Sequence, residues 1–203
     1  MTPRPGTVRI LRAADREAVA WKNGGGVTRE IAAWPEGAGM GDFAWRVSLA
    51  EVAADGPFSA FPGVDRTLTL AEGAGMDLTV AGAHRRVAER YAPQHFPGDA
   101  PTHCRLLDGP VVNFNVMYRR GLAPADTAVV RGTLAVVSAP GDVLLIVALH
   151  GPAELDADGG ATVALGRYDA VLLPGSFSGV LRSPGHTALV RLAARAARAA
   201  RAG

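Results

Sequence analysis

Cysteine, long apolar runs and targeting segments are nearly absent from this sequence of 203 residues. Cys104 is the single cysteine, which excludes an internal disulfide framework and is compatible with a reducing compartment. The longest apolar run, Val143 to Leu149, is far too short to cross a bilayer. No apolar stretch follows Met1 to Pro5, so no signal peptide is predicted. These absences predict a soluble, cytoplasmic protein with no membrane partner.

The sequence also has little excess charge. Its formal net charge is +2 and its pI is near 9.1, but the surplus is local, because the last thirteen residues contain Arg191, Arg195, Arg198 and Arg201. A nucleic-acid surface needs a basic face with stacking aromatics, whereas this tail offers alanine and arginine. We therefore predict no nucleic-acid partner, and expect Ala193 to Arg201 to form a short helix or to fray.

Motifs for nucleophilic or phosphate chemistry are missing as well. The segment Gly175 to Gly179 has Phe177, not serine, at the centre of what would be a nucleophile elbow. Gly24 to Gly26 lacks the ending of a P-loop, and Gly37 to Gly41 lacks the spacing of a dinucleotide fingerprint. No base can be placed beside Cys104, which is expected to be a buried, inert thiol.

Turn residues and alternating segments are abundant. The chain has 25 Gly and 14 Pro, which favours many short strands over long helices. Phe43–Glu51 and Val111–Arg119 alternate with period two, as strands with two different faces do. Further strands are predicted at Thr67–Ala71, Thr127–Ser138, Val143–Leu149, Ala161–Ala164, Ala170–Leu173, Gly179–Ser183 and Ala188–Leu192, the last two separated by a turn at Pro184-Gly185. Apart from the C-terminus, Arg12–Ala20 alone is predicted to be helical, and the pattern indicates a β-sandwich or barrel.

Several blocks of the sequence resemble the HutD/Ves family. They keep the family's order and cover roughly residues 8–120: Trp21–Gly26 with Thr28–Glu30, Phe43–Ser48, Asp55–Ser59, Phe61–Arg66, Glu72-Gly73, and Asn113–Met117 with Arg119-Arg120. The C-terminal half matches more loosely, and there Leu165–Gly175 resembles the second motif of cupins.

The resemblance implies an all-β, double-cupin fold made of two jelly-roll barrels with little helix. A composition shift near Gly121–Thr127 places the expected boundary between residues 1–122 and 123–203, with strands exchanged between the halves allowed. The resemblance also implies a link to bacterial histidine utilisation, with a small pathway compound as ligand and a role as brake or sensor. Because cupin sheets often pair edge to edge, it allows a homodimer.

A metal cofactor is not expected. Cupin metal sites need His-x-His, a Glu and a distant His, but no two of the five histidines are separated by a single residue. His103 and Cys104 adjoin, and neighbouring strand residues point to opposite faces. Ser176 to Ser178 fill the position where metal cupins place a histidine. No other cofactor is predicted.

Polar residues on strands are the candidate ligand-binding groups. Asn113 and Asn115 share one strand face with Met117 and Arg119, and asparagine is unfavourable in strands. This face is either a solvated outer surface or the lining of a barrel lumen, and the resemblance on this segment favours the lumen. Met117 and Arg119 are included in the predicted site on that basis.

The glycine-rich turn and a neighbouring strand supply the remaining candidates. Gly24 to Gly26 could turn backbone N–H groups toward one point, with Lys22 and Asn23 beside them, or could form an ordinary turn. Arg46 and Ser48 lie opposite the apolar face of their strand, and the guanidinium suits a carboxylate, although an outer-face arginine is an equal alternative. Asp65-Arg66 is interpreted as a structural ion pair.

Lysine and arginine beside neutral amides match an anionic, carboxylate-bearing ligand, and urocanate, N-formylglutamate and formate are the compounds that the resemblance suggests. The first hypothesis is therefore a non-enzymatic binder that modulates histidine breakdown. The second is a metal-independent cupin enzyme that uses Glu51 or a histidine as base. The third is a module that docks to another protein through a sheet face. Fold analogy does not choose among them.

Overall fold

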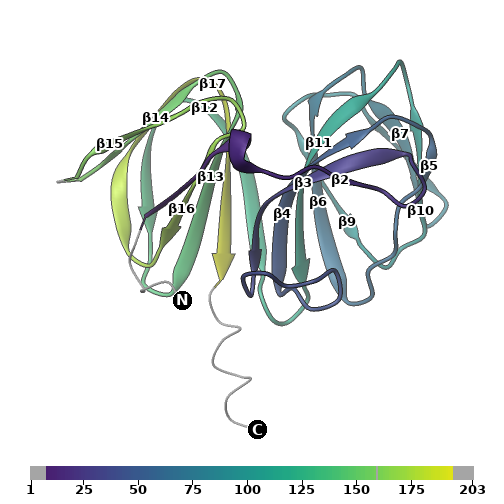
Figure 1. Cartoon of the computed structure of the whole chain (residues 1–203), viewed down its shortest axis with the longest axis horizontal. Coiled ribbons are helices and arrows are strands. Elements are labelled where there is room, and N and C mark those ends of the chain that lie inside the picture. Colours follow the sequence, from purple (N-terminus) through teal and green to yellow (C-terminus); the bar gives the residue numbers. More distant parts are fainter. Residues whose placement is uncertain (1–7, 159, 194–203) are drawn as a thin grey trace, which may run out of the picture. The chain divides into compact units, whose positions relative to one another are not determined.

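The computed structural model describes residues 8–158 and 160–193, and nearly all of its regular structure is β-strand. The chain divides into two units, each with its own sheets (Figure 1). The first unit is Arg16–Leu122. The second consists, among the described residues, of 8–15 and 123–193. Within these residues, no helix has the length and hydrophobicity that a membrane span requires.

The first unit is built from two antiparallel sheets. The larger has six strands in the order β2-β3-β4-β11-β6-β9, which are Val19–Ala20, Gly26–Trp34, Trp45–Val52, Val111–Arg119, Val64–Glu72 and Pro93–Pro97. The smaller has the order β5-β10-β7-β8, which are Gly56–Pro57, Thr102–Leu106, Met76–Val80 and Ala83–Val87. Buried side chains of both sheets, Leu68 and Leu70 from one and Met76 and Leu78 from the other, pack in a common core, as in a sandwich whose faces meet.

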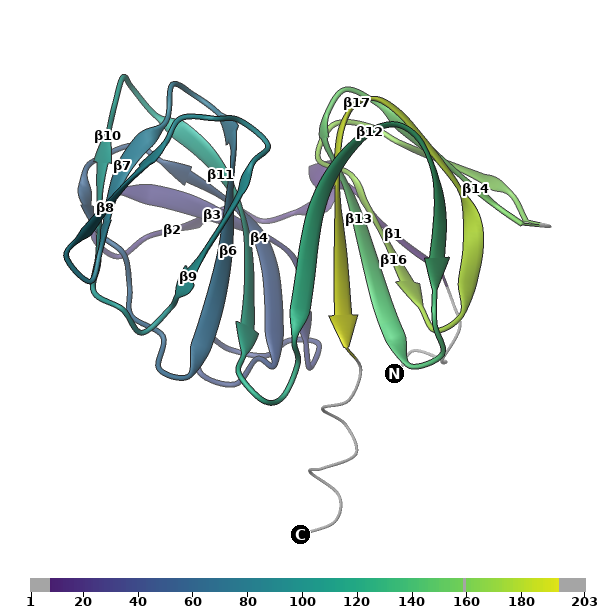
Figure 2. The ribbon, with the colours of Figure 1, turned by 180° about the vertical axis from the view of Figure 1, so that it is seen from behind.

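The second unit is one strongly bent, seven-stranded sheet. Its order is β1-β16-β13-β17-β14-β15, which are Arg9–Leu11, Ala170–Pro174, Asp142–His150, Phe177–Ala193, Ala153–Ala157 and Thr162–Leu165, and β12 (Ala125–Ser138) also pairs with β17 (Figure 2). One end of β17 pairs with β13 and the other with β14, so the sheet curls around its own core. Aliphatic side chains fill that core, including Ile146, Leu155 and Leu173.

The predicted turn at Pro184-Gly185 is wrong. These residues lie inside one continuous strand, where the pairing with β12 and with β13 shifts register. A Cβ on Gly185 would lie 1.7 Å from the carbonyl oxygen of His150, so glycine is required for the two strands to approach. The pair Pro-Gly therefore marks a bulge that bends the strand rather than a hairpin.

The predicted helix at Arg12–Ala20 is wrong. The segment contains a single 3₁₀ turn, Ala13–Asp15, and then enters β2. Tertiary contacts override helix propensity here: Asp169 accepts hydrogen bonds from Ala13 N at 2.8 Å and from Arg12 Nη1 at 2.7 Å. Because β1 pairs with β16, residues 8–15 belong with the second unit and not with the first. The expected helix at Ala193–Arg201 lies, after Ala193, outside the described residues.

Candidate functional site

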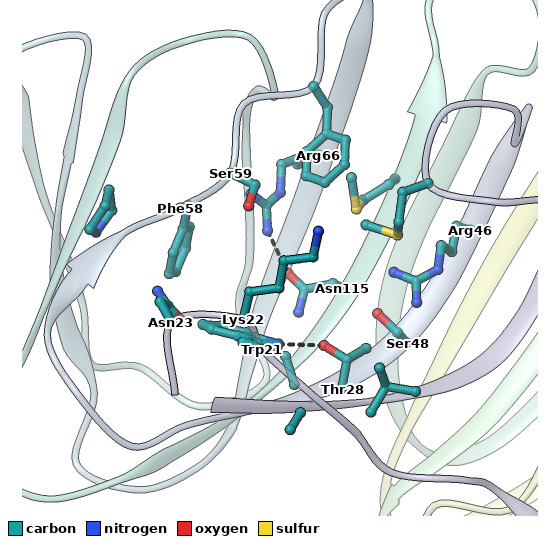
Figure 3. Close-up of a pocket in the computed structure, with 17 residues that line it drawn as sticks. Trp21, Lys22, Asn23, Thr28, Arg46, Ser48, Phe58, Ser59, Arg66 and Asn115 are labelled. Carbon is teal, nitrogen blue, oxygen red and sulfur yellow. Dashed lines mark hydrogen bonds between the residues drawn. The ribbon is translucent and has the colours of Figure 1, made fainter. Parts of the chain in front are cut away.

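The first unit contains a cavity of about 600 Å³ between the Trp21–Asn23 turn, strands β3, β4, β6 and β11, and the loop after β5 (Figure 3). Its polar walls are Lys22, Asn23, Thr28, Arg46, Ser48, Ser59, Arg66 and Asn115, and its larger apolar walls are Trp21, Met40, Phe58, Phe61 and Met117. Among the described residues that line it, none is Asp, Glu, His or Cys. The cavity therefore combines three cationic side chains with amides, hydroxyls and apolar surface.

The sheet register places these side chains in rows. Residues directly opposite each other in an antiparallel pair share a face, and β11 pairs with β4 on one side and β6 on the other. The first row is Arg46, Met117 and Arg66, the second is Ser48, Asn115 and Leu68, and the third is Ala50, Asn113 and Leu70. On β11 the cavity wall includes Met117 and Asn115, whereas Asn113 and Leu70 of the third row lie in the apolar core with Met76.

Arg66 is the most unusual group in the cavity. Its residue exposure is 9%, its Nη2 donates to Asn115 Oδ1 at 3.4 Å, and its buried Nε has no hydrogen-bond partner. The guanidinium carbon lies over the rings of Phe58, Phe96 and Phe61, at 5.1, 5.4 and 6.0 Å from their centroids. Burial lowers the pKa of Arg66 to about 10, so the side chain keeps its charge at neutral pH.

The predicted Asp65–Arg66 ion pair is wrong. Asp65 pairs with Arg120 at 2.7 Å, and Arg120 also pairs with Asp99 at 2.7 Å. Within the described residues, no carboxylate lies within 4 Å of the Arg66 guanidinium. Successive strand residues point to opposite faces, so Asp65 and Arg66 separate. The sequence signal that could have identified Arg66 is its position two residues before Leu68 on the same strand, which places both side chains on the face that meets the core.

The Trp21–Gly26 segment is a tight turn in which the amides of Gly24 and Gly25 already have hydrogen-bond partners. Gly24 N donates to Trp21 O at 3.0 Å, and Gly25 N donates to Asn23 Oδ1 at 3.1 Å. These two donors are thus not available for an anion, which favours the ordinary turn over the backbone concavity. Trp21 Nε1 donates to Thr28 Oγ1 at 2.8 Å, and Lys22 extends into the cavity in Figure 3. The lysine side chain is what this turn contributes to the site.

Six of the eight residues predicted from the sequence line the cavity: Lys22, Asn23, Arg46, Ser48, Asn115 and Met117. The other two do not. Asn113 is buried in the core, with Nδ2 at 3.9 Å from Met76 Sδ and with Oδ1 unpartnered. Arg119 donates to the carbonyl oxygens of Phe43, at 3.0 Å, and Gly41, so it holds a loop and does not face the cavity.

Neither Glu51, the residue suggested as a catalytic base, nor the single cysteine lies at the cavity. Glu51 pairs with Arg29 and is absent from the cavity wall. Cys104 is fully buried beside Met76, and burial together with Asp55 raises the pKa of its thiol to about 11. In the part of the chain that the structure describes, no three His, Cys, Asp or Glu side chains cluster as metal ligands would.

Comparison with known proteins places this chain in a family. The HutD family model matches residues 13–190. The chain belongs to the HutD family. A 21.2 kDa protein in the hutC 3′ region of Pseudomonas putida is 35% identical over 83% of this chain and 88% of its own length. Protein Ves of Citrobacter koseri is 34% identical over 82% of this chain and 91% of its own length.

Solved structures agree with this assignment. HutD from Pseudomonas fluorescens, in a formate condition, is 32% identical, covers 92% of this chain and 98% of its own, and superposes with a TM-score of 0.80. A cupin 2 conserved barrel domain protein from Leptotrichia buccalis, at 12% identity and a TM-score of 0.54 over 86% of this chain and 91% of its own, shows likeness of fold alone. The predicted family and the predicted all-β, double-cupin fold are confirmed.

Proposed function

We propose that the cavity of the first unit is a receptor for a small carboxylate, and that this HutD-family protein uses it as a sensor or modulator of histidine breakdown without catalysing a reaction. The observation that supports the proposal most strongly is the state of Arg66. A buried guanidinium without a carboxylate partner is costly because its charge has lost its hydration. A ligand anion that hydrogen-bonds to it would offset that cost.

The chemistry of the cavity fits an organic carboxylate. A guanidinium presents planar, forked donors that match a carboxylate, and Asn115 and Ser48 add neutral hydrogen-bonding groups in the next row. Apolar walls such as Trp21 and Phe58 suit the body of a ligand. One charge-assisted hydrogen bond contributes about 1.5–3 kcal/mol, so two of them with good shape fit support roughly micromolar binding.

The link to histidine breakdown comes from the relatives. One is encoded in a hutC 3′ region and another is named HutD, so urocanate, N-formylglutamate and formate are the proposed ligands. The competing hypothesis of an enzyme needs a general base at the cavity. None of the described wall residues offers a carboxylate or an imidazole, which favours binding over turnover.

A thermal-shift screen against histidine, urocanate, N-formylglutamate, glutamate and formate, with EDTA as a control, tests the proposal. We expect a selective rise in Tm that persists in EDTA and disappears in Arg66→Met. The matched control is Arg105→Met, which removes an exposed arginine paired with Asp77 on the smaller sheet and should leave the shift intact. No shift with any compound contradicts the proposal. The proposed role in modulating histidine breakdown is contradicted if a deletion strain shows unchanged growth on histidine and unchanged levels of the pathway intermediates.

A further inference from the structure

Arg46 differs from Arg66 because it already forms an ion pair, with the carboxylate of Glu30. Arg46 lines the cavity with a side chain that is 13% exposed, and its Nε donates to Glu30 Oε2 at 2.6 Å. Glu30 is 40% exposed and is not part of the cavity wall. Among the described residues, the two terminal nitrogens of Arg46 make no hydrogen bond, and in Figure 3 its guanidinium lies beside Ser48.

The sheet fixes this arrangement. Glu30 lies opposite Ser48 in the β3–β4 pair, so it shares the face of β4 that also presents Arg46. Diagonal neighbours on one face are within reach of long side chains. A bulge between Glu30 and Ala32 then places Ala33 opposite Arg46, and its small side chain leaves the glutamate as the group that contacts the guanidinium.

We infer that Glu30 is a specificity-determining residue, which sets how much negative charge the cavity accepts. The inference rests on the proposed function, since it assumes that an anion binds beside Arg46 and Arg66. Through its hydrogen bond to Nε, Glu30 holds the terminal nitrogens of Arg46 toward the ligand. The negative charge of Glu30 also repels an anionic ligand, and this repulsion increases with each carboxylate that the ligand carries.

These two actions of Glu30 can be separated by substitution. Glu30→Gln keeps an oxygen acceptor for Arg46 Nε but removes the charge, whereas Glu30→Ala removes both. A unit charge about 6 Å from a ligand carboxylate, at a partly hydrated rim, changes affinity by roughly five-fold. A ligand with two carboxylates gains more from the loss of that charge than a ligand with one, so the ratio of their affinities should change.

Calorimetric titrations at pH 8 with urocanate, which has one carboxylate, and N-formylglutamate, which has two, test the inference. We expect Glu30→Gln to tighten urocanate binding by roughly five-fold and N-formylglutamate binding by more, with the gain shrinking at high salt because exposed charges are screened. Glu30→Ala should gain less than Glu30→Gln. The matched control is Glu51→Gln, which breaks the Arg29–Glu51 ion pair away from the cavity wall and should leave both affinities within about two-fold.

The outcomes separate the two proposals. If the wild-type protein binds either compound and Glu30→Gln leaves both affinities unchanged, or weakens both, the inference about Glu30 is overturned while the proposed function stands. An equal gain in Glu51→Gln also overturns it, because general charge would then explain the effect. If no variant binds either compound, the proposed function fails and the inference about Glu30 fails with it.

Discussion

Replacing Arg66 with methionine should stabilise the ligand-free protein while removing anion binding. The reason is that Arg66 is buried at 9% exposure, lacks a carboxylate partner, and has an unpartnered Nε. A buried charge of this kind can bind a ligand anion, but it lowers the free energy of unfolding of the ligand-free protein. Methionine has a flexible side chain that suits contact with aromatic rings, so it can occupy the space among Phe58, Phe61 and Phe96.

The magnitude follows from two opposing contributions. Burial lowers the pKa of Arg66 to about 10, and this lowering corresponds to a desolvation cost of about 3 kcal/mol. Three cation–π contacts at 5.1, 5.4 and 6.0 Å recover about 2 kcal/mol together, at roughly 0.5–1 kcal/mol each. The net expectation is a gain of about 1 kcal/mol in the free energy of unfolding, or about 2–4 °C in Tm for a chain of this size.

Chemical denaturation of the ligand-free wild type and of Arg66→Met measures this difference directly. Arg105→Met provides the comparison, since its exposed ion pair with Asp77 should change stability by less than about 0.5–1 kcal/mol. A loss of more than about 2 kcal/mol in Arg66→Met would refute the reasoning. It would mean that Arg66 stabilises the core of the unliganded protein, and that it is not a binding group whose burial costs stability.

Three further outcomes are expected. Burial and Asp55 raise the pKa of the Cys104 thiol from 9.0 to about 11, so with rising pH this thiol ionises in the unfolded chain before it does in the folded protein. The free energy of unfolding should therefore fall by about 2 kcal/mol between pH 9 and 11, and denaturation measured across this pH range should show a smaller fall in Cys104→Ala. Asn113→Leu should raise the free energy of unfolding by about 1 kcal/mol without changing anion affinity, because the Asn113 Oδ1 is buried and unpartnered; a loss of affinity in titration would place it in the site. Gly26→Ala should lower the free energy of unfolding by more than about 2 kcal/mol, because a Cβ there would lie 2.3 Å from Glu51 O and 3.2 Å from the Trp21 ring; a normal melting curve would contradict this.

Strands that alternate without interruption were predictable from the sequence. The segment Val111–Arg119 matches β11 residue for residue, because both of its faces follow the period of two. Strand β3 was missed, since Gly26–Trp34 carries charged residues at its centre and a bulge breaks its alternation. The bend in β17 was interpreted as a turn because Pro184-Gly185 is a turn signal, and only the approach of His150 shows that the strand continues.

The candidate site was predictable in its polar strand residues but not in its central charge. Asn115 and Ser48 stood out because polar side chains on a strand face need a reason, and both line the cavity. Arg66 was assigned to its sequence neighbour Asp65, although strand geometry sends adjacent side chains to opposite faces. Which cation lacks a carboxylate depends on contacts between strands, such as Glu30 with Arg46, and no local pattern encodes those contacts.

The most direct test of the central claim is a calorimetric titration of the wild-type protein and of Arg66→Met with whichever carboxylate gives the largest thermal shift. A single cavity anchored by Arg66 predicts one site on the wild type with roughly micromolar affinity, a loss of at least about ten-fold in Arg66→Met, and wild-type affinity in Arg105→Met. Equal affinity in wild type and Arg66→Met would contradict the claim, because the ligand would then bind elsewhere or without the buried guanidinium.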